Sequence, residues 1–202
     1  MLQGIMRSVL IFSLFLAASS LRAADGARLA ERCDDCHGPN GVSEDREVPA
    51  ISGFAPYAIL DLLESYRIGE RKSRRHEGID GRRTDMNEIS ADLTVIEAQV
   101  VADYYGRQRW VPKDQPFNRS LAKRGAKIHE IKCAGCHSDY GGDPDDELAL
   151  LLGQWRDYLE LEFDKFDKGT RPMPDKMGSK YKSLTAADKR ALLELYASGG
   201  RF

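Results

Sequence analysis

The sequence predicts an all-α protein made of two tandem copies of one module. Apolar residues recur at helical spacing in several segments, and no segment alternates apolar and polar residues as a half-buried strand would. Several residues of the first half have an identical or similar partner at a nearly constant distance in the second half. The chain has 202 residues, of which 42% are hydrophobic and 31% charged, which suits one or two small globular domains.

The internal repeat emerges when residue numbers are subtracted. The pairs that differ by 100 are Cys33 and Cys133, His37 and His137, Gly53 and Gly153, Tyr66 and Phe166, Gly69 and Gly169, and Arg71 and Arg171. The pairs that differ by 91 are Met86 and Met177, Leu93 and Leu184, and Tyr105 and Tyr196. A constant offset with one shift indicates a duplicated module whose second copy has a shorter loop.

The repeat sets the predicted domain boundaries. We expect a first domain over residues 25–105 and a second over residues 120–202, joined by a short connector over residues 106–119. The spacing of apolar residues predicts helices over residues 25–32, 57–68, 93–105 and 184–197. The last helix of each domain is expected to pack across the first helix of the same domain.

The N-terminal segment has the pattern of a secretory signal peptide. Arg7 precedes an almost wholly apolar run over residues 9–18, and small residues follow as far as Ala24. A retained membrane anchor is the alternative, but the run is far shorter than the roughly 20 residues that a spanning helix needs. We therefore predict a signal peptide over residues 1–24, cleaved between Ser20 and Ala24, and a periplasmic protein without a membrane span.

Two cysteine motifs use all four cysteines of the chain, because residues 33–37 and residues 133–137 both read Cys-x-x-Cys-His. Two cysteines three positions apart lie on one side of a helical turn, where each can bond to a vinyl group of one porphyrin. The histidine that follows is then placed to bind the iron, and this is the attachment pattern of a c-type haem. The predicted haem-binding residues are Cys33, Cys36, Cys133 and Cys136, with His37 and His137 as iron ligands.

A single Cys-x-x-Cys has other interpretations, namely a redox dithiol, half of a zinc site, or a disulfide. A zinc site would need both pairs to converge on one ion and would leave the histidines without a role. A thioredoxin-like dithiol would need a βαβ context, which the pattern does not provide. Two copies, each followed directly by histidine, favour two covalently bound haems.

The sixth iron ligand decides what a haem can do. A methionine thioether closes the iron and raises its potential, which suits electron transfer, whereas an open position suits gas binding or catalysis. Met86 and Met177 occupy matching positions, each seven residues before a leucine that begins a predicted last helix. We predict these two methionines as the sixth ligands, with Met173 as the competitor of Met177 and a core-filling role as the alternative for each.

Other residues near the motifs have weaker patterns. The carbonyl of Pro49 is placed to accept a hydrogen bond from the ring of His37, which would fix the imidazole, and Ala149 is the equivalent residue of the second copy. His76 and His129 belong to no motif, so we expect both to be surface residues and not ligands.

The charges are unevenly distributed. Residues 25–105 hold 10 Lys and Arg against 17 Asp and Glu, whereas residues 120–202 hold 14 of each. Residues 71–75 form a basic cluster in the acidic half, which is either a solvated loop or a docking patch for an electron acceptor. Arg71 and Arg171 match in the repeat and are either partners of haem propionates or exposed residues. The net charge of −2 argues against a nucleic-acid partner.

With two haem motifs and matched methionines, the chain resembles the dihaem class I cytochromes c of the c-four type. Residues 152–159 look like that family's segment after the second haem. A narrower resemblance, to the cytochrome subunit of flavocytochrome c sulfide dehydrogenase, rests on residues 110–117, 125–129 and 171–177. It implies a heterodimer with a separate FAD-containing flavoprotein that oxidises sulfide and passes electrons to this chain one at a time.

Three functions compete at this point. The first is an electron-transfer subunit of a sulfide-oxidising flavocytochrome, which is not catalytic by itself. The second is a free dihaem carrier that serves a terminal oxidase or another redox partner. The third is a dihaem peroxidase, which needs a haem with an accessible distal side, whereas both modules here offer a methionine.

Overall fold

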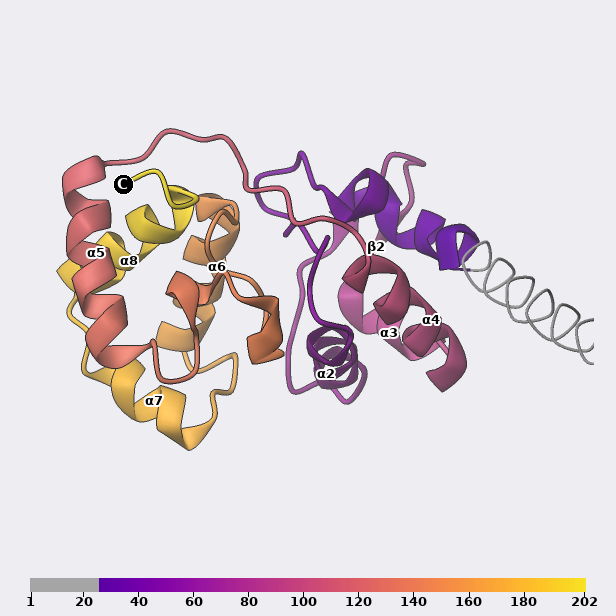
Figure 1. Cartoon of the computed structure of the whole chain (residues 1–202). Coiled ribbons are helices and arrows are strands. Elements are labelled where there is room, and N and C mark those ends of the chain that lie inside the picture. The colour runs from indigo at the N-terminus through magenta and orange to yellow at the C-terminus, as the bar shows by residue number, and fades with distance from the viewer. Residues whose placement is uncertain (1–25) are drawn as a thin grey trace, which may run out of the picture.

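The structure is a computed structural model that describes residues 26–202, so the predicted signal peptide over residues 1–24 lies outside the described residues. Two helical modules are joined by an extended connector that follows residue 106 (Figure 1). The arrangement confirms the predicted all-α class with two tandem domains.

Each module is a small set of helices linked by tight turns. The first contains the helix over residues 26–37, η1 (Pro39–Gly41), α2 (Pro56–Arg67), β1 (His76–Glu77), β2 (Arg83–Thr84), α3 (Met86–Asp92) and α4 (Val95–Gly106). The second contains α5 (Arg119–Lys132), η2 (Asp139–Gly141), η3 (Pro144–Asp146), α6 (Arg156–Asp167), α7 (Asp175–Lys182) and α8 (Ala186–Ala197). Helices α2, α4 and α8 confirm three predicted helices, with ends that differ by at most two residues.

Two predicted segments differ from the structure. The first helix was expected to end at residue 32 but continues through the cysteine motif to residue 37. The segment after α2, for which the sequence predicted no strand, contains a small antiparallel hairpin, in which His76 of β1 pairs with Thr84 of β2. Strands of two residues are too short to produce a visible alternation of apolar and polar residues.

The last helix of each module begins with the same cap. Thr94 starts α4 by accepting from the backbone N–H of Glu97, whose carboxylate accepts in return from the backbone N–H of Thr94. Thr185 and Asp188 form the same reciprocal pair at the start of α8. Each cap satisfies donors that a helix end leaves unpaired, and is worth about 1 kcal/mol.

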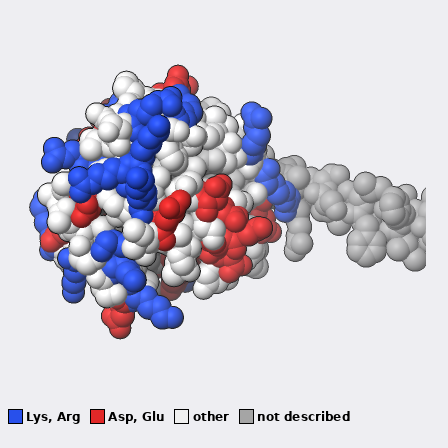
Figure 2. Space-filling view, turned by 60° about the vertical axis from the view of Figure 1, so that its left-hand side comes forward, with Lys and Arg blue, Asp and Glu red and all other residues white. Residues whose placement is uncertain are grey.

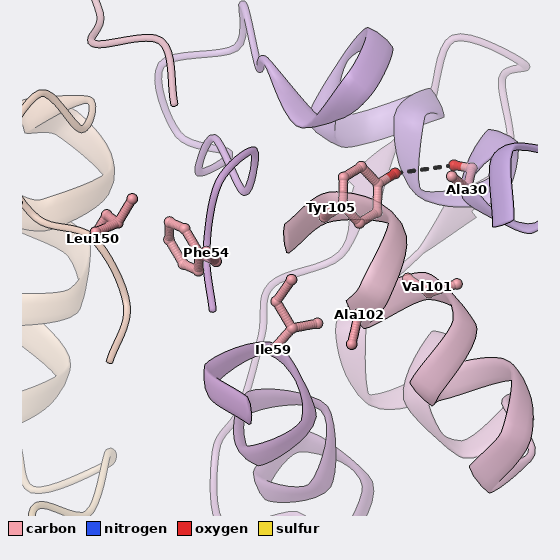
Figure 3. Packing of buried hydrophobic residues seen from close by; sticks show 7 residues of the cluster. All are labelled: Ala30, Phe54, Ile59, Val101, Ala102, Tyr105 and Leu150. Carbon is pink, nitrogen blue, oxygen red and sulfur yellow. Dashed lines mark hydrogen bonds between the residues drawn. The ribbon is translucent and has the colours of Figure 1, made fainter. Parts of the chain in front are cut away.

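The core of the first module extends into the second (Figure 3). Tyr105 of α4 is fully buried and donates a hydrogen bond to the carbonyl of Ala30, which joins the last helix of the module to the first. Phe54 packs in the same cluster as Leu150, which belongs to the second module. The two modules therefore share buried apolar surface.

In the second module the first and last helices cross closely. A side chain at Gly125 of α5 would place its Cβ 2.1 Å from the carbonyl oxygen of Ala191 in α8, so glycine is required at the crossing. The predicted packing of the last helix across the first is confirmed here.

Buried hydrogen bonds fix the two modules against one another. Gln154 is fully buried, and its amide oxygen accepts from the backbone N–H of Ala50 at 3.0 Å. Its amide nitrogen donates to the carbonyl of the same residue at 2.9 Å. The indole N–H of Trp155 donates to the carbonyl of Ser43 at 3.0 Å. These hydrogen bonds form only when the two modules are in contact, so they stabilise one arrangement of the modules.

Candidate functional site

A large cavity in the first module brings together the four residues predicted to hold its haem. Cys33, Cys36, His37 and Met86 all lie on its wall, and its volume including the open mouth is about 1330 Å³. The wall is otherwise mainly apolar, with Ile51, Phe54, Ile59, Leu63, Ile89 and Val101 among its residues. The extent of this apolar wall and its open mouth suit a large, mostly apolar group.

The imidazole of His37 is held in one orientation. Its Nδ1 lies 2.8 Å from the carbonyl oxygen of Pro49, which confirms the predicted contact. A carbonyl can only accept, so Nδ1 carries the proton and Nε2 is left with its lone pair. Burial lowers the pKa of His37, which keeps the ring neutral at physiological pH. Neutral imidazole with a free Nε2 is the form that binds a metal.

Met86 is fixed by its neighbours at the start of α3. Its backbone N–H donates to the hydroxyl of Ser73 at 2.8 Å. The side-chain amide of Asn87 donates to the carbonyls of Tyr66 at 2.6 Å and Arg71 at 2.8 Å. These bonds tie the start of α3 to the end of α2 and the loop after it. The roles of Ser73 and Asn87 could not be predicted from the sequence, because isolated polar residues carry no periodic signal.

The four cysteines do not form disulfides with one another. Burial raises the pKa of Cys33 to about 11, and burial is also the main cause that raises the pKa of Cys133. Among residues 26–202, no three His, Cys, Asp or Glu side chains are placed to share a metal ion. The two cysteine pairs therefore do not converge into the four-ligand zinc site that was the alternative to haem.

The second motif differs in local structure from the first. It follows the end of α5, and the backbone N–H groups of Cys136 and His137 both donate to the carbonyl of Cys133, at 3.1 and 3.0 Å. Within the described part of the chain, no hydrogen bond reaches the ring of His137, so Ala149 does not act as Pro49 does. Burial lowers the pKa of His137, as it does for His37.

The expectation that His129 is a surface residue was wrong. This residue is fully buried in α5, where Nε2 donates to the carbonyl of His137 at 2.7 Å and Nδ1 lies 3.1 Å from the hydroxyl of Tyr196. Both ring nitrogens are thus occupied, in agreement with the prediction that His129 is not a ligand. Its spacing from the buried Ala122 and Ala126 on the same helix is a helical pattern that could have indicated its burial.

The histidine and the two methionines that remain from the sequence predictions are all half-buried. His76, also expected on the surface, is half-buried in β1 and lies on the wall of the first cavity. Met177 lies in α7 and Met173 in the segment before it, and both are half-buried. Met177 stays the predicted second ligand because of its match to Met86 in the repeat.

Of the four cations in the basic cluster over residues 71–75, one is buried and three are exposed, as in a solvated loop. Arg71 is buried. Arg74 forms an ion pair with Glu47, and Arg75 forms one with Glu88. Three of its four cations are therefore paired within the protein, and the docking patch stays a prediction.

Comparison with known proteins identifies the family. No family model matches the chain. The chain is 30% identical over 166 residues to a cytochrome c4 of Pseudomonas aeruginosa, which covers 77% of this chain and 76% of that protein. The chain belongs to the cytochrome c4 family. Members of this family are dihaem class I cytochromes c, so this cytochrome is an electron carrier with covalently bound haem c.

The chain is also similar to other proteins over most of its length. It is 26% identical over 204 residues to a thiosulfate dehydrogenase electron acceptor of Stutzerimonas stutzeri, covering 92% of this chain and 91% of that protein. Its fold matches the crystal structure of a reduced cytochrome c4 from Pseudomonas stutzeri, with a TM-score of 0.69 at 22% identity over 87% of this chain and 97% of that one. It also matches a thiosulfate dehydrogenase from Marichromatium purpuratum, with a TM-score of 0.70 at 21% identity over 87% of this chain and 40% of that one.

The first cavity of this cytochrome fits a haem in its polar detail as well as in its apolar wall. Arg71 lies on the cavity wall and is only 3% exposed. Its Nε is buried and has no hydrogen-bond partner. A buried donor without an acceptor is costly, by about 1–3 kcal/mol, and the carboxylate of a haem propionate is an acceptor of the right chemistry.

The surroundings of the two cysteine motifs in this cytochrome differ in charge. Burial raises the pKa of Cys36, and the nearby Asp35 and Asp80 raise it further. Near Cys133 the neighbouring charges are Lys132 and Lys180, which lower its pKa against the effect of burial. Figure 2 shows Lys and Arg spread over the left-hand side of the view and a group of Asp and Glu gathered on its right-hand side. No helix among residues 26–202 is long and apolar enough to span a membrane.

Proposed function

We propose that this chain holds one haem c in each module and closes both irons with histidine and methionine, so that it exchanges electrons without binding a substrate. The observation that carries the proposal is the meeting of Cys33, Cys36, His37 and Met86 on one apolar cavity wall. In the second module the repeat assigns the same roles to Cys133, Cys136, His137 and Met177. An iron bound by nitrogen and sulfur accepts and releases one electron at a high potential.

The protein's own groups prepare each site. Pro49 fixes the tautomer and the angle of the His37 ring, and burial keeps the ring neutral. The bonds of Ser73 and Asn87 hold α3 so that Met86 lies on the cavity wall. Rigid ligands limit the movement that accompanies a change of iron charge, which favours fast electron transfer.

We propose further that the electrons come from a periplasmic dehydrogenase that oxidises an inorganic sulfur compound. The first candidate is an FAD-containing sulfide dehydrogenase subunit that forms a heterodimer with this chain. Its support is the resemblance of residues 110–117, 125–129 and 171–177 to the cytochrome subunit of such enzymes. Lys113 and Gln115 of the connector are buried and bind carbonyls of Ser43 and Gln154, so part of this resemblance reflects packing between modules.

A thiosulfate dehydrogenase is the second candidate donor. Its support is the relative named as a thiosulfate dehydrogenase electron acceptor, which matches this chain over 92% of its length. Either donor would deliver electrons to a carrier that passes them to a soluble or membrane-bound acceptor. A free dihaem carrier with another donor is the remaining alternative.

Purification of the protein from its source separates these possibilities. A flavin that copurifies, together with reduction of the haems on addition of sulfide, would support the flavoprotein. Reduction by thiosulfate only when a separate thiosulfate dehydrogenase is added would support the second donor. Reduction by neither would refute the sulfur-oxidation proposal and leave a carrier with another donor. Carbon monoxide binding to the reduced wild-type protein would contradict closed irons and favour a peroxidase.

A further inference from the structure

The first cavity is completed by residues of the second module. Tyr158, Glu162 and Lys165 of α6 lie on its wall together with the predicted haem ligands of the first module. Charged groups of one module are therefore placed beside the haem site of the other. Neither the proposed ligands nor the donor candidates account for these residues.

Arg71 connects the modules at this wall. Its Nη2 lies 2.9 Å from a carboxylate oxygen of Glu162 and donates to the hydroxyl of Tyr158 at 2.8 Å. Its guanidinium lies over the ring of Tyr66, with 4.8 Å to the centroid. Both side chains of the Arg71–Glu162 pair are 4% exposed. The Nε of Arg71 is buried and has no hydrogen-bond partner, which leaves a donor available at the cavity wall.

Glu162 is shared by three cations. Besides Arg71, it binds Arg171 at 2.5 Å and Lys165 at 2.7 Å. Burial acts to raise the pKa of Glu162, but Arg71, Arg171 and Lys165 together outweigh it and hold the pKa below its usual range. The carboxylate is thus ionised at neutral pH. The cluster keeps an excess of positive charge, which is compensated only if an anionic group lies next to it.

The repeat shows that this arrangement is not a simple duplication. Arg71 and Arg171 are equivalent residues, but the positions equivalent to Tyr158 and Glu162 are Ala58 and Leu62. Two symmetric arginines therefore converge on a carboxylate that only the second module supplies. The single carboxylate orients both arginines without neutralising both.

We propose that Glu162 is a positioning residue that acts across the module interface: it holds Arg71 at the first haem cavity and, through its charge, lowers the reduction potential of the first haem. The proposal rests on the haem sites proposed above. A negative charge near an iron opposes the addition of an electron, whereas a positive charge favours it. Removal of Glu162 and removal of Arg71 should consequently shift the potential of the first haem in opposite directions.

The test is a redox titration of the purified full-length holoprotein, followed by visible absorption. The first haem is the one whose potential falls in Met86→Ala. We expect Glu162→Gln to raise the potential of this haem and Arg71→Gln to lower it. Glu162→Asp, which keeps the charge, should stay nearer to the wild type than Glu162→Gln. The matched control is Asp164→Asn, since Asp164 lies on the same helix in an exposed pair with Lys168 and should leave both potentials unchanged.

A role in folding alone would give a different result. It would lower the melting temperature of each variant, but Glu162→Gln and Arg71→Gln would not shift the potential of the first haem in opposite directions. That outcome would overturn the proposal. If Glu162→Gln does not fold, an unchanged or raised potential in Arg71→Gln overturns it equally. The haem count and the methionine-ligation band of the wild type are measured first, because their absence would refute the proposed haem sites and not the role of Glu162.

Discussion

The two modules share a scaffold but hold their histidine ligands differently. In the first module the motif continues a helix, and the ring of His37 is fixed by Pro49. In the second module the motif lies in turns after α5, and the buried His129 donates to the backbone carbonyl of His137. The ring of His137 itself has no hydrogen bond within residues 26–202. The comparison teaches that a duplicated fold preserves the ligands and the apolar core, while the groups that orient the ligands diverge.

The largest expected effect comes from the predicted sixth ligands. Met86→Ala should open the first iron, allow carbon monoxide to bind the reduced protein, and lower one potential by about 0.1 V or more, within the ~0.8 V range that axial ligands span. Met177→Ala should do the same to the other haem. Redox titration measures both effects, and Met173→Ala is the control that should change neither potential. An unchanged potential and spectrum in Met86→Ala would refute the assignment.

A second prediction concerns the modules' shared interface. Gln154→Leu should lower the free energy of unfolding by about 1–3 kcal/mol, because it leaves the buried N–H and carbonyl of Ala50 without partners. Thermal unfolding of the holoprotein measures the loss. The matched change Gln99→Leu removes an exposed amide that binds Asp103 and should cost much less. Equal losses in the two variants would show that the buried amide does not stabilise the interface.

The histidine that distinguishes the second module gives a third prediction. His129→Leu places there the residue type found at the equivalent position of the first module, Leu29. It leaves the carbonyl of His137 unpaired, so we expect a loss of about 1–3 kcal/mol in stability and a changed spectrum of the second haem alone. Calorimetry and visible spectra check these two effects. A change in the spectrum of the first haem instead would contradict the proposed local role of His129.

The smallest expected effect concerns charge around the motifs. The rate of electron transfer to an anionic oxidant such as hexacyanoferrate should fall a few-fold in Lys180→Glu at low salt, because Lys180 lies near Cys133. The difference should fade near 0.15 M salt, where the screening length is about 8 Å. Stopped-flow absorbance measures the rate, and a cationic oxidant should show the opposite change. A loss of rate that is equal for both oxidants would exclude electrostatic steering.

The sequence predicted much of the fold because its signals are local. Helical spacing indicated α2, α4 and α8, and the cysteine motifs with Met86 indicated the residues that line the first cavity. Helix α3 was missed because it is short and mostly polar, and its start depends on the Asp85 cap. The contact of Arg71 with Glu162 could not be predicted, since Glu162 lies in the other module and its equivalent in the repeat is Leu62. Contacts between distant segments leave no period in a single sequence.

The most direct examination of the whole account is a pyridine haemochrome assay on the mature protein, combined with near-infrared spectroscopy of its oxidised form. We expect two porphyrins per polypeptide, each retained after denaturation through sulfur bonds, and two irons that show thioether coordination. A single retained porphyrin, or zinc bound by the cysteines in its place, would contradict the duplicated electron-carrying design.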